Sequence, residues 1–549
     1  MDVNDIAFLR SQGNVFGLPE NPELVPDRGI GEIYFEKMKE HAEKIAQIDA
    51  VTGKEESYAE MLSRTIRVAQ GLQIRGITED DVVALCSFNT MENQIPILAS
   101  LFLNIKSINI DPRTPLHEVI PLLEQVTPKI IFCASDAVKT MEEAVANLQL
   151  HCEIVTFENT QTHTPYSEFL VRRSPEDEFR PVPVQSVYDV ALMHFSSGTT
   201  NVPKAVCCRH YALYYGLKWF MLKMQQIDVI INFISPYCAS SSMLVFWSIM
   251  TGTPRVICEK FDPETTCKYM EVYKANTTIL ATVIVNMMTK HPEICNYDLS
   301  AMRNIMVGGS VVTADTCRKF IRLFPHASMN ICYGMTETFS AIFLYNTITE
   351  DKLINNTVSV GTPLPGVTYK IVDTDTDEAL GPNQIGELRI KSKGIFAAYY
   401  NQPESYASVF DSEGFYKTGD MLYYDENYEF YVVDRIKDMF KYNSCQIKPK
   451  SIENVLLTHP DVAECVVVGI PTENIGEIPT GVVVLKNGKR TRPEELLEYV
   501  NARVDVRFRL DGGVRIVDSL PYTISGKIQS RLIRETIMRE QLGSNNNAH

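Results

Sequence analysis

A run of small and hydroxylated residues ends in a lysine, in a form suited to holding a phosphate. It comprises Ser196, Ser197, Gly198, Thr199, Thr200, Asn201, Val202, Pro203 and Lys204. Hydroxyl and backbone N–H groups can donate hydrogen bonds to phosphate oxygens, glycine permits close approach of the backbone, and lysine adds positive charge. The spacing differs from that of the common P-loop. The segment is therefore either an unusual phosphate-binding loop or an ordinary polar turn after a strand.

A second candidate motif follows a predicted strand at residues 327–332. It consists of Tyr333, Gly334, Met335, Thr336 and Glu337. The tyrosine ring can stack on a flat base, the threonine hydroxyl can bind phosphate, and the glutamate can hold Mg²⁺. The alternative is a buried tyrosine followed by a helix that starts at Thr336.

Three further polar motifs lie toward the C-terminal end of the sequence. Asp420 ends the stretch 416–420 after a tight turn, where a carboxylate suits a pair of ribose hydroxyls, although a plain turn would use the same residue. Asp434 and Arg435 are adjacent, and their alternative interpretation is a surface ion pair of little energetic value. Lys527 follows a serine and a glycine on a predicted loop, where most lysines are simply exposed.

The elements that position these motifs form two patterns. Short apolar strands alternate with helices in the first half, which predicts an α/β domain with largely parallel sheets. The predicted strands are 82–86, 108–110, 130–133 and 187–193, and the predicted helices are 58–75, 91–103 and 115–126. The same alternation continues to residue 310.

The second pattern begins after residue 361, where the predicted strands 367–373, 386–391 and 430–433 indicate a β-rich subdomain. Beyond Asp434 we expect a small α+β domain of about a hundred residues. Its predicted helices are 451–457 and 493–504, and its predicted strands are 464–468, 481–485 and 514–517. The basic stretch 435–441 lies at the junction and is either functional or a solvated linker.

Composition narrows the classes of function. A chain of 549 residues predicts two to four domains. The 52 basic and 68 acidic residues give a net charge of −16, which argues against nucleic acid or an anionic membrane as the main partner but not against a nucleotide. We expect no transmembrane segment, since the most apolar stretch, 95–103, is too short to span a bilayer.

The sequence predicts the subcellular location of the protein only broadly. We expect no secretory signal, because the first ten residues include Asp2 and Asp5 and lack a long apolar core. The 13 cysteines are scattered without paired zinc-type spacing, which favours reduced thiols in an intracellular compartment. The sequence ends in Ala-His and not in a Ser-Lys-Leu-type peroxisomal signal, so cytoplasm and peroxisome both stay open.

The motifs together resemble the signature regions of the adenylate-forming superfamily, which includes acyl-CoA synthetases, 4-coumarate–CoA ligases and firefly luciferase. The matching regions are 195–206, 333–337, 416–420, 434–441 and 525–527, and the stretches 386–388, 399–404 and 459–469 are also similar. The resemblance covers nearly the whole chain and is strongest to the branch of luciferase and insect acyl-CoA synthetases.

The resemblance implies an α/β fold with a specific division of the chain. Residues 1–434 would form an N-terminal adenylation domain of two α/β subdomains and a β-rich subdomain. Residues 435–441 would form a hinge region, and residues 442–549 would form a small mobile α+β domain. Family members rotate this C-terminal domain between two half-reactions, about a hinge that corresponds to Lys437 here.

The implied reaction joins a carboxylic acid to a thiol. The carboxylate attacks the α-phosphate of ATP to give an acyl-adenylate and pyrophosphate, and the thiol of CoA then displaces AMP. Lys527 would bridge the carboxylate and the α-phosphate in the first step, offsetting charge in the transition state. Lys441 would face the active site in the second step.

The resemblance also implies roles for the other motif residues. Tyr333 and Gly334 would lie against adenine near Gly309 and Ser310, and Glu337 would hold Mg²⁺. Thr336 would contact the α-phosphate, and Asp420 and Arg435 would bind ribose. The loop that would hold the β- and γ-phosphates comprises Ser196, Ser197, Gly198, Thr199, Thr200 and Lys204.

Four positions depart from the family pattern. Asn201 and Ala205 replace glycines of the phosphate loop, and asparagine is the residue after glycine best suited to a positive φ. Ala239 stands where many relatives have a histidine near the acyl site, which makes light emission of the luciferase type an unexpected activity. Ser444 replaces a glycine that helps line the thiol tunnel.

Two functions of different class therefore remain open. The first is a ligase that uses ATP, Mg²⁺ and CoA to activate a small-molecule carboxylic acid. The residues expected to line the acyl-binding site are a mixture of polar and apolar types and are moderately apolar as a group. This favours a medium- or long-chain fatty acid and leaves an aromatic acid possible. These residues include Ser240, Ser241, Met243, Val311, Phe339 and Ala341. The second is a catalytically weak paralogue that binds a nucleotide or acyl ligand without forming thioesters.

Overall fold

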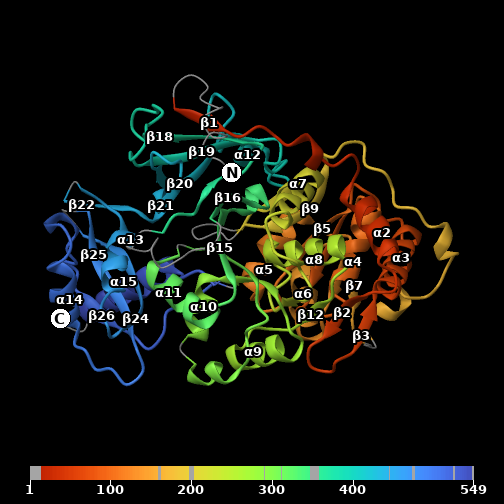
Figure 1. Ribbon diagram of the computed structural model, residues 1–549, viewed down its shortest axis with the longest axis horizontal. Helices are drawn as coiled ribbons and strands as arrows, with labels where there is room; N and C mark the ends of the chain where they lie inside the picture. The colour runs from red at the N-terminus through yellow and green to blue at the C-terminus, as the bar shows by residue number, and fades with distance from the viewer. Residues whose placement is uncertain are drawn as a thin grey trace.

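Sheets of seven, nine and five strands build the large N-terminal part of the molecule, and sheets of two and three strands build the small C-terminal part (Figure 1). This arrangement confirms the predicted fold class. The structure is a computed structural model that describes residues 14–158, 162–196, 203–289, 291–310, 312–345, 358–443, 445–472, 476–523 and 526–546.

The seven-stranded sheet has the order β10-β9-β5-β4-β6-β7-β8, and only the β9–β10 pair is antiparallel. Its strands are β4 (Val82–Cys86), β5 (Lys106–Ile110), β6 (Ile130–Cys133), β7 (Glu153–Thr156), β8 (Thr164–Pro165), β9 (Val190–Phe195) and β10 (Ala205–Arg209). The strand predicted at 187–193 thus begins three residues later. Four helices accompany the sheet: α3 (Tyr58–Ile74), α4 (Gln94–Phe102), α5 (Leu116–Val126) and α6 (Ser135–Asn147).

The nine-stranded sheet has the order β17-β16-β15-β14-β13-β11-β12-β2-β3, with β3, β16 and β17 antiparallel to their neighbours. Its strands are β2 (Ile45–Asp49), β3 (Glu55–Ser57), β11 (Ile230–Asn232), β12 (Arg255–Ile257), β13 (Thr277–Ala281), β14 (Asn304–Gly308), β15 (Ser328–Gly334), β16 (Ala341–Tyr345) and β17 (Thr362–Pro363). The helices of this part are α2 (Ile30–Glu40), α7 (His210–Met221), α8 (Ala239–Thr251), α9 (Pro263–Val272), α10 (Thr282–Met288) and α11 (Ala314–Leu323).

The five-stranded sheet is antiparallel throughout, with the order β1-β18-β19-β20-β21. Its strands are β1 (Val15–Gly17), β18 (Val367–Val372), β19 (Gly386–Ser392), β20 (Tyr416–Tyr424) and β21 (Phe430–Arg435), with α12 (Pro403–Ser408) in the connection. This sheet is the predicted β-rich subdomain. The N-terminal strand β1 completes its edge, a long-range pairing that the sequence pattern did not indicate.

The C-terminal part has its own apolar core, built around Ile447, Ile452, Val483 and Leu496. Its strands are β22 (Phe440–Tyr442), β23 (Cys445–Ile447), β24 (Val462–Pro471), β25 (Glu477–Leu485) and β26 (Val514–Ile516), and its helices are α13 (Pro449–Leu456), α14 (Pro493–Asn501) and α15 (Ser530–Asn546). Within the described ranges, none of the helices is both long and apolar enough to cross a bilayer.

Candidate active site

The predicted phosphate loop connects the antiparallel strands β9 and β10. The backbone N–H of Ser196 donates to the carbonyl of Lys204 at 2.8 Å, and the N–H of Lys204 donates to the Ser196 hydroxyl at 3.0 Å. These bonds close the base of the loop and fix where its lysine emerges. Ser197, Gly198, Thr199, Thr200 and Asn201 lie outside the described residues, so their phosphate contacts stay a prediction.

Tyr333 brings the second and third motifs together. It lies near the end of β15, and its hydroxyl donates to Oδ2 of Asp420 on β20 at 2.7 Å. Its ring packs against Phe343, with 5.6 Å between the centroids. Gly334 is required beside it, because a Cβ there would lie 2.6 Å from the carbonyl oxygen of Ser340. Stacking of Tyr333 on a base stays a prediction.

Asp420 offers a buried acceptor of the kind that a ribose hydroxyl could use. The side chain is only 6% exposed, and its Oδ1 lies 2.9 Å from Nε of Arg435 at the end of β21. The contact is an ion pair without hydrogen-bond geometry, and Oδ1 has no hydrogen-bond partner among the described residues. A buried acceptor of this kind calls for a ligand donor. The two predicted ribose-binding residues therefore lie together and fit that ligand.

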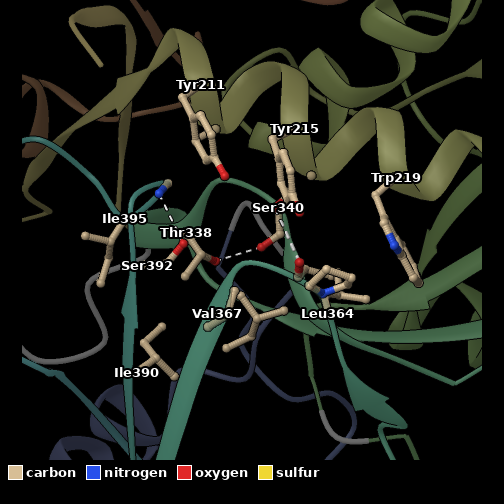
Figure 2. Close-up of a pocket in the computed structure, with 16 residues that line it drawn as sticks. Tyr211, Tyr215, Trp219, Thr338, Ser340, Leu364, Val367, Ile390, Ser392 and Ile395 are labelled. Carbon is tan, nitrogen blue, oxygen red and sulfur yellow. Dashed lines mark hydrogen bonds between the residues drawn. The ribbon is translucent and has the colours of Figure 1, made fainter. Parts of the chain in front are cut away.

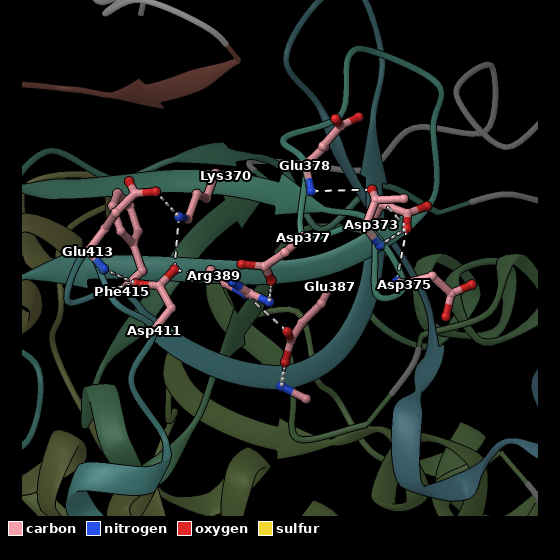
Figure 3. A network of polar contacts seen from close by, with 12 residues as sticks. Lys370, Asp373, Asp375, Asp377, Glu378, Glu387, Arg389, Asp411, Glu413 and Phe415 are labelled. Carbon is pink, nitrogen blue, oxygen red and sulfur yellow. Dashed lines mark hydrogen bonds and ion pairs between the residues drawn. The ribbon is translucent and has the colours of Figure 1, made fainter.

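A network of buried charges supports the turn before Asp420 (Figure 3). The N–H of Gly419, which has a φ of +71°, donates to Glu387 at 3.2 Å. Glu387 pairs with Arg389 at 3.1 Å, and Arg389 also pairs with Asp411 at 3.2 Å. Lys370 completes the chain at 2.8 Å from Asp411. This network was not predicted, although charged residues at alternate positions of a buried strand are an unusual pattern.

Lys527 reaches these residues from the C-terminal part of the chain. Its loop is closed by an N–H···O bond of 2.7 Å from Thr523 to the Lys527 carbonyl. Burial and the neighbouring cations Arg435 and Lys437 lower the pKa of Lys527 to about 8, against the opposing effect of Asp420 and Glu337. The charges that act on Lys527 are thus those of the predicted nucleotide site.

A glycine allows the Lys527 loop to lie against the N-terminal part. Gly526 has a φ of +79°, and a Cβ there would lie 2.8 Å from Cγ1 of Val283 on α10. Lys441, in contrast, is exposed on β22 opposite Gln446. The role of Lys527 in the first half-reaction and that of Lys441 in the second both stay predictions.

Thr336 and Glu337 begin a short 3₁₀ helix, η6 (Thr336–Thr338), directly after β15. The Glu337 carboxylate accepts a hydrogen bond from the Tyr399 hydroxyl at 3.0 Å. The ammonium of Lys204 lies 4.5 Å from the centroid of the Tyr399 ring. The single carboxylate of Glu337 fits Mg²⁺, which commonly takes one or two carboxylates together with phosphate oxygens.

Gly309 and Ser310 lie at the carboxyl end of β14, beside the ends of β13 and β15. Gly309 has a φ of +85°, and a Cβ there would meet nothing within 4 Å. The Ser310 carbonyl accepts a hydrogen bond from Thr282 at 3.4 Å. Ligands of α/β proteins bind at such strand ends, so both residues lie where a nucleotide could reach them.

Three side chains meet beside the start of α8, in the region predicted to line the acyl site. Nε2 of His194 lies 3.4 Å from the Ser242 hydroxyl, and the His194 ring packs against Phe339 at 5.8 Å. Burial lowers the pKa of His194 to about 4, so the ring is neutral. The charge of Lys527 acts on Cys238, the N-cap of α8. Phe339 and Ala239 were predicted to lie at the acyl site, whereas His194 was not.

The backbone at Phe339 is strained. Its φ is +56° and its ψ is −35°, and the N–H of Ser340 donates to the Thr338 carbonyl at 2.6 Å, which makes a γ-turn. Such conformations persist only where the surroundings hold them and are frequent at functional sites. This turn directs the buried Phe339 ring toward His194.

A cavity lies behind this turn, between α7 and strands β16, β18 and β19 (Figure 2). The cavity volume is about 30 Å³, which leaves room for water and not for a carboxylic acid. It shares Ala341 with the residues predicted to line the acyl site. The remaining lining includes Tyr211, Tyr215, Trp219, Leu364, Ile390 and Ile395.

Comparison with known proteins gives two family matches and many relatives. The AMP-binding enzyme family matches residues 34–400, and the AMP-binding enzyme C-terminal domain matches residues 451–527. A luciferin 4-monooxygenase of Nipponoluciola cruciata is 33% identical, and the match covers 90% of this chain and 92% of the relative. A 4-coumarate–CoA ligase of Petroselinum crispum is 30% identical, and the match covers 92% of this chain and 93% of the relative.

Solved structures agree with the fold and with the family. The luciferase-like enzyme of the nonluminescent mealworm Zophobas morio is 34% identical, with a TM-score of 0.71, and covers 77% of this chain and 99% of its own. The ATP-bound MatB of Rhodopseudomonas palustris is 24% identical, with a TM-score of 0.82, covers 92% and 98%, and supports the fold alone. With both family regions present in order and a relative 33% identical over 90% of the chain, this chain belongs to the AMP-binding, adenylate-forming enzyme family.

Proposed function

We propose that this protein is an ATP-dependent carboxylic acid–CoA ligase that works through an acyl-adenylate. The observation that carries the proposal is the position of Lys527, which the C-terminal loop brings within the electrostatic reach of Asp420, Arg435 and Glu337. A lysine so placed can serve a nucleotide and a carboxylate together. A relative named as a 4-coumarate–CoA ligase, at 30% identity over 92% of the chain, supports the reaction class.

In the proposed first step, Asp420 accepts hydrogen bonds from the ribose hydroxyls, and Lys204 holds the terminal phosphates. Lys527 donates to the acid and to the α-phosphate. A carboxylate oxygen forms a bond to the α-phosphorus while the bond to the β-phosphate oxygen breaks, and pyrophosphate leaves. Bound Mg²⁺, held by Glu337, would neutralise phosphate charge.

In the proposed second step, the C-terminal part turns about residues 435–441, removing Lys527 and bringing Lys441 to the site. The sulfur of CoA forms a bond to the acyl carbon, the bond to the phosphate oxygen of AMP breaks, and the thiol proton leaves to solvent. Lys437 lies in the short helix η8 (Ile436–Asp438), between the large part and β22. This position suits a pivot.

We further propose a medium- or long-chain fatty acid as the substrate. Phe339 and Ala341 are buried and apolar, and Ala239, at the start of α8, adds only a methyl group. Serines 240–242 follow on the same helix and give the wall a mixed character. An aromatic acid would meet the same groups, so the test below includes both classes.

Ala239 favours a second candidate function, a binding paralogue with weak chemistry. In this chain α8 presents a methyl group where a histidine would bring a ring nitrogen near the acid. Such a protein would bind ATP and release no pyrophosphate when any acid is added.

The test is pyrophosphate release with ATP, Mg²⁺ and acids of graded chain length and aromatic acids, with and without CoA. We expect release that depends on one acid class, acyl-CoA formation, and loss of both in Lys527→Met. Lys489→Met, at a lysine of the same domain that is 52% exposed, is the matched control and should keep both activities. If protein that binds ATP releases no pyrophosphate with any of the acids, the binding paralogue is left as the function.

A further inference from the structure

We infer that Tyr399 is a positioning residue that holds Lys204 and Glu337 apart and orients both toward the phosphates of the nucleotide. The inference rests on the proposed function only in that it takes these two residues to serve Mg²⁺ and phosphate. The Tyr399 side chain contacts both motifs at once, although the two lie 133 positions apart in the sequence (337 − 204).

The contacts use different parts of the tyrosine. Its hydroxyl donates to Oε1 of Glu337 at 3.0 Å. The ammonium of Lys204 lies over the face of its ring, 4.5 Å from the centroid, a distance at which a cation is attracted to an aromatic ring. Tyr399 is only 4% exposed, and its partners Lys204 and Glu337 are half-buried, so the two contacts lie at the edge of the protein interior.

The backbone around Tyr399 is fixed to both motifs. Tyr399 forms a β-bridge with Val206, and the N–H of Phe396 donates to the Glu337 carbonyl at 2.8 Å. Three more backbone bonds of 2.8 to 2.9 Å tie the same segment to β10: Ala397 to Cys207, Cys207 to Ala398, and Tyr400 to Ala205. Tyr399 therefore stands on a rigid frame that joins β10 to the η6 turn.

The ring prevents an ion pair that would disable the site. Lys204 contacts the ring face of Tyr399 and Glu337 contacts its hydroxyl, and none of the ion pairs within the described ranges joins these two opposite charges. Without the ring, attraction would draw the ammonium onto the carboxylate. Lys204 would then be lost to phosphate and Glu337 to the metal.

Two substitutions separate the two contacts. Tyr399→Phe keeps the ring between the charges and removes only the hydroxyl that orients Glu337. Tyr399→Leu removes the aromatic face as well, which frees Lys204. Tyr400, the next residue on the same segment, provides matched controls in Tyr400→Phe and Tyr400→Leu.

The experiment is calorimetric titration of ATP into the full-length protein at a series of Mg²⁺ concentrations, with no acid present. For Tyr399→Phe we expect the ATP affinity measured without Mg²⁺ to equal that of the wild type. The variant should need about a tenfold higher Mg²⁺ concentration to reach the same gain in ATP affinity, because it has lost a group that orients a metal ligand. For Tyr399→Leu we expect weaker ATP binding both with and without Mg²⁺. Both Tyr400 variants should bind as wild type.

The inference is overturned if Tyr399→Phe binds ATP with the wild-type affinity at every Mg²⁺ concentration. The conservative variant keeps this test decisive even where Tyr399→Leu does not fold, as judged by circular dichroism. Failure of the proposed function has a different signature, in which wild-type protein binds Mg²⁺ and ATP but no acid elicits pyrophosphate. Wild-type protein that binds no ATP overturns both.

Discussion

Lys527 is the residue whose protonation controls the proposed first step. Its pKa of about 8 lies below the usual range for lysine, because burial and nearby Arg435 and Lys437 disfavour the ammonium form. The ammonium form is therefore complete below pH 7 and is lost as pH rises through 8. Only that form can offset the charge that develops on carboxylate and phosphate.

We predict that kcat/KM for adenylation, which reports the free enzyme, falls about tenfold for each pH unit above 8. Lys527→Arg should carry a positive charge throughout this range and give a flat profile at lower activity. The measurement is acid-dependent pyrophosphate release between pH 6.5 and 9.5 at saturating Mg²⁺. An unchanged profile in Lys527→Arg would assign the titration to another group.

Single residues also show how far sequence reasoning could reach. Asp420, Arg435 and Tyr333 were predicted because each belongs to a short motif, and the structure brings these three together. Their mutual contacts were not predicted, since the register of β15, β20 and β21 sets them. Tyr399 and His194 were given no role, although the stretch 399–404 resembles the family, because each looks like an ordinary core residue until its distant partner is known.

At the scale of elements, uninterrupted apolar runs were predicted with the correct bounds. Strands β4 and β6 match the predicted 82–86 and 130–133 because both faces of each are buried, so every position carries the same signal. Helix α3 was also found, and its start is fixed by the Ser57 and Glu60 capping box. Strand β1 was not predicted, since three residues that pair with β18 leave no local pattern.

Strand β19 places Arg389 between the buried carboxylates of Glu387 and Asp411, and its substitution tests the network. Arg389→Met leaves both carboxylates with fewer partners, and we expect unfolding free energy to fall by about 3 kcal/mol. Chemical denaturation measures this change. The affinity for ATP should fall as well, because Glu387 holds the N–H of Gly419 beside Asp420. Lys391→Met, at an exposed position on the same strand, should change neither quantity measurably.

At the scale of the whole molecule, the contact between Gly526 and Val283 determines how closely the two parts of the chain can approach. Gly526→Val adds a branched side chain where even a Cβ would lie 2.8 Å from Val283, at a φ of +79°. We predict that adenylation slows by at least about tenfold, the equivalent of 1.4 kcal/mol in the barrier. The Lys527 loop can no longer seat against α10.

The second half-reaction supplies the comparison for that variant. Thioester formation from a synthetic acyl-adenylate should proceed at the wild-type rate in Gly526→Val, since the loop has left the site by then. Gly488→Val is the matched control, because Gly488 has a similar φ of +78° but open space around it. Equal slowing of both half-reactions in Gly526→Val would indicate general damage to the fold.

The tryptophans of this chain are confined to one of its two parts. The chain has two tryptophans, Trp219 and Trp247, and both lie in the large part, one beside the cavity of Figure 2 and the other fully buried. Residues 442–549 contain none. Tryptophan fluorescence therefore reports on the large part alone. An acceptor dye attached at the C-terminus would receive energy from natural donors, so a turn of the small part would change emission without any engineered donor.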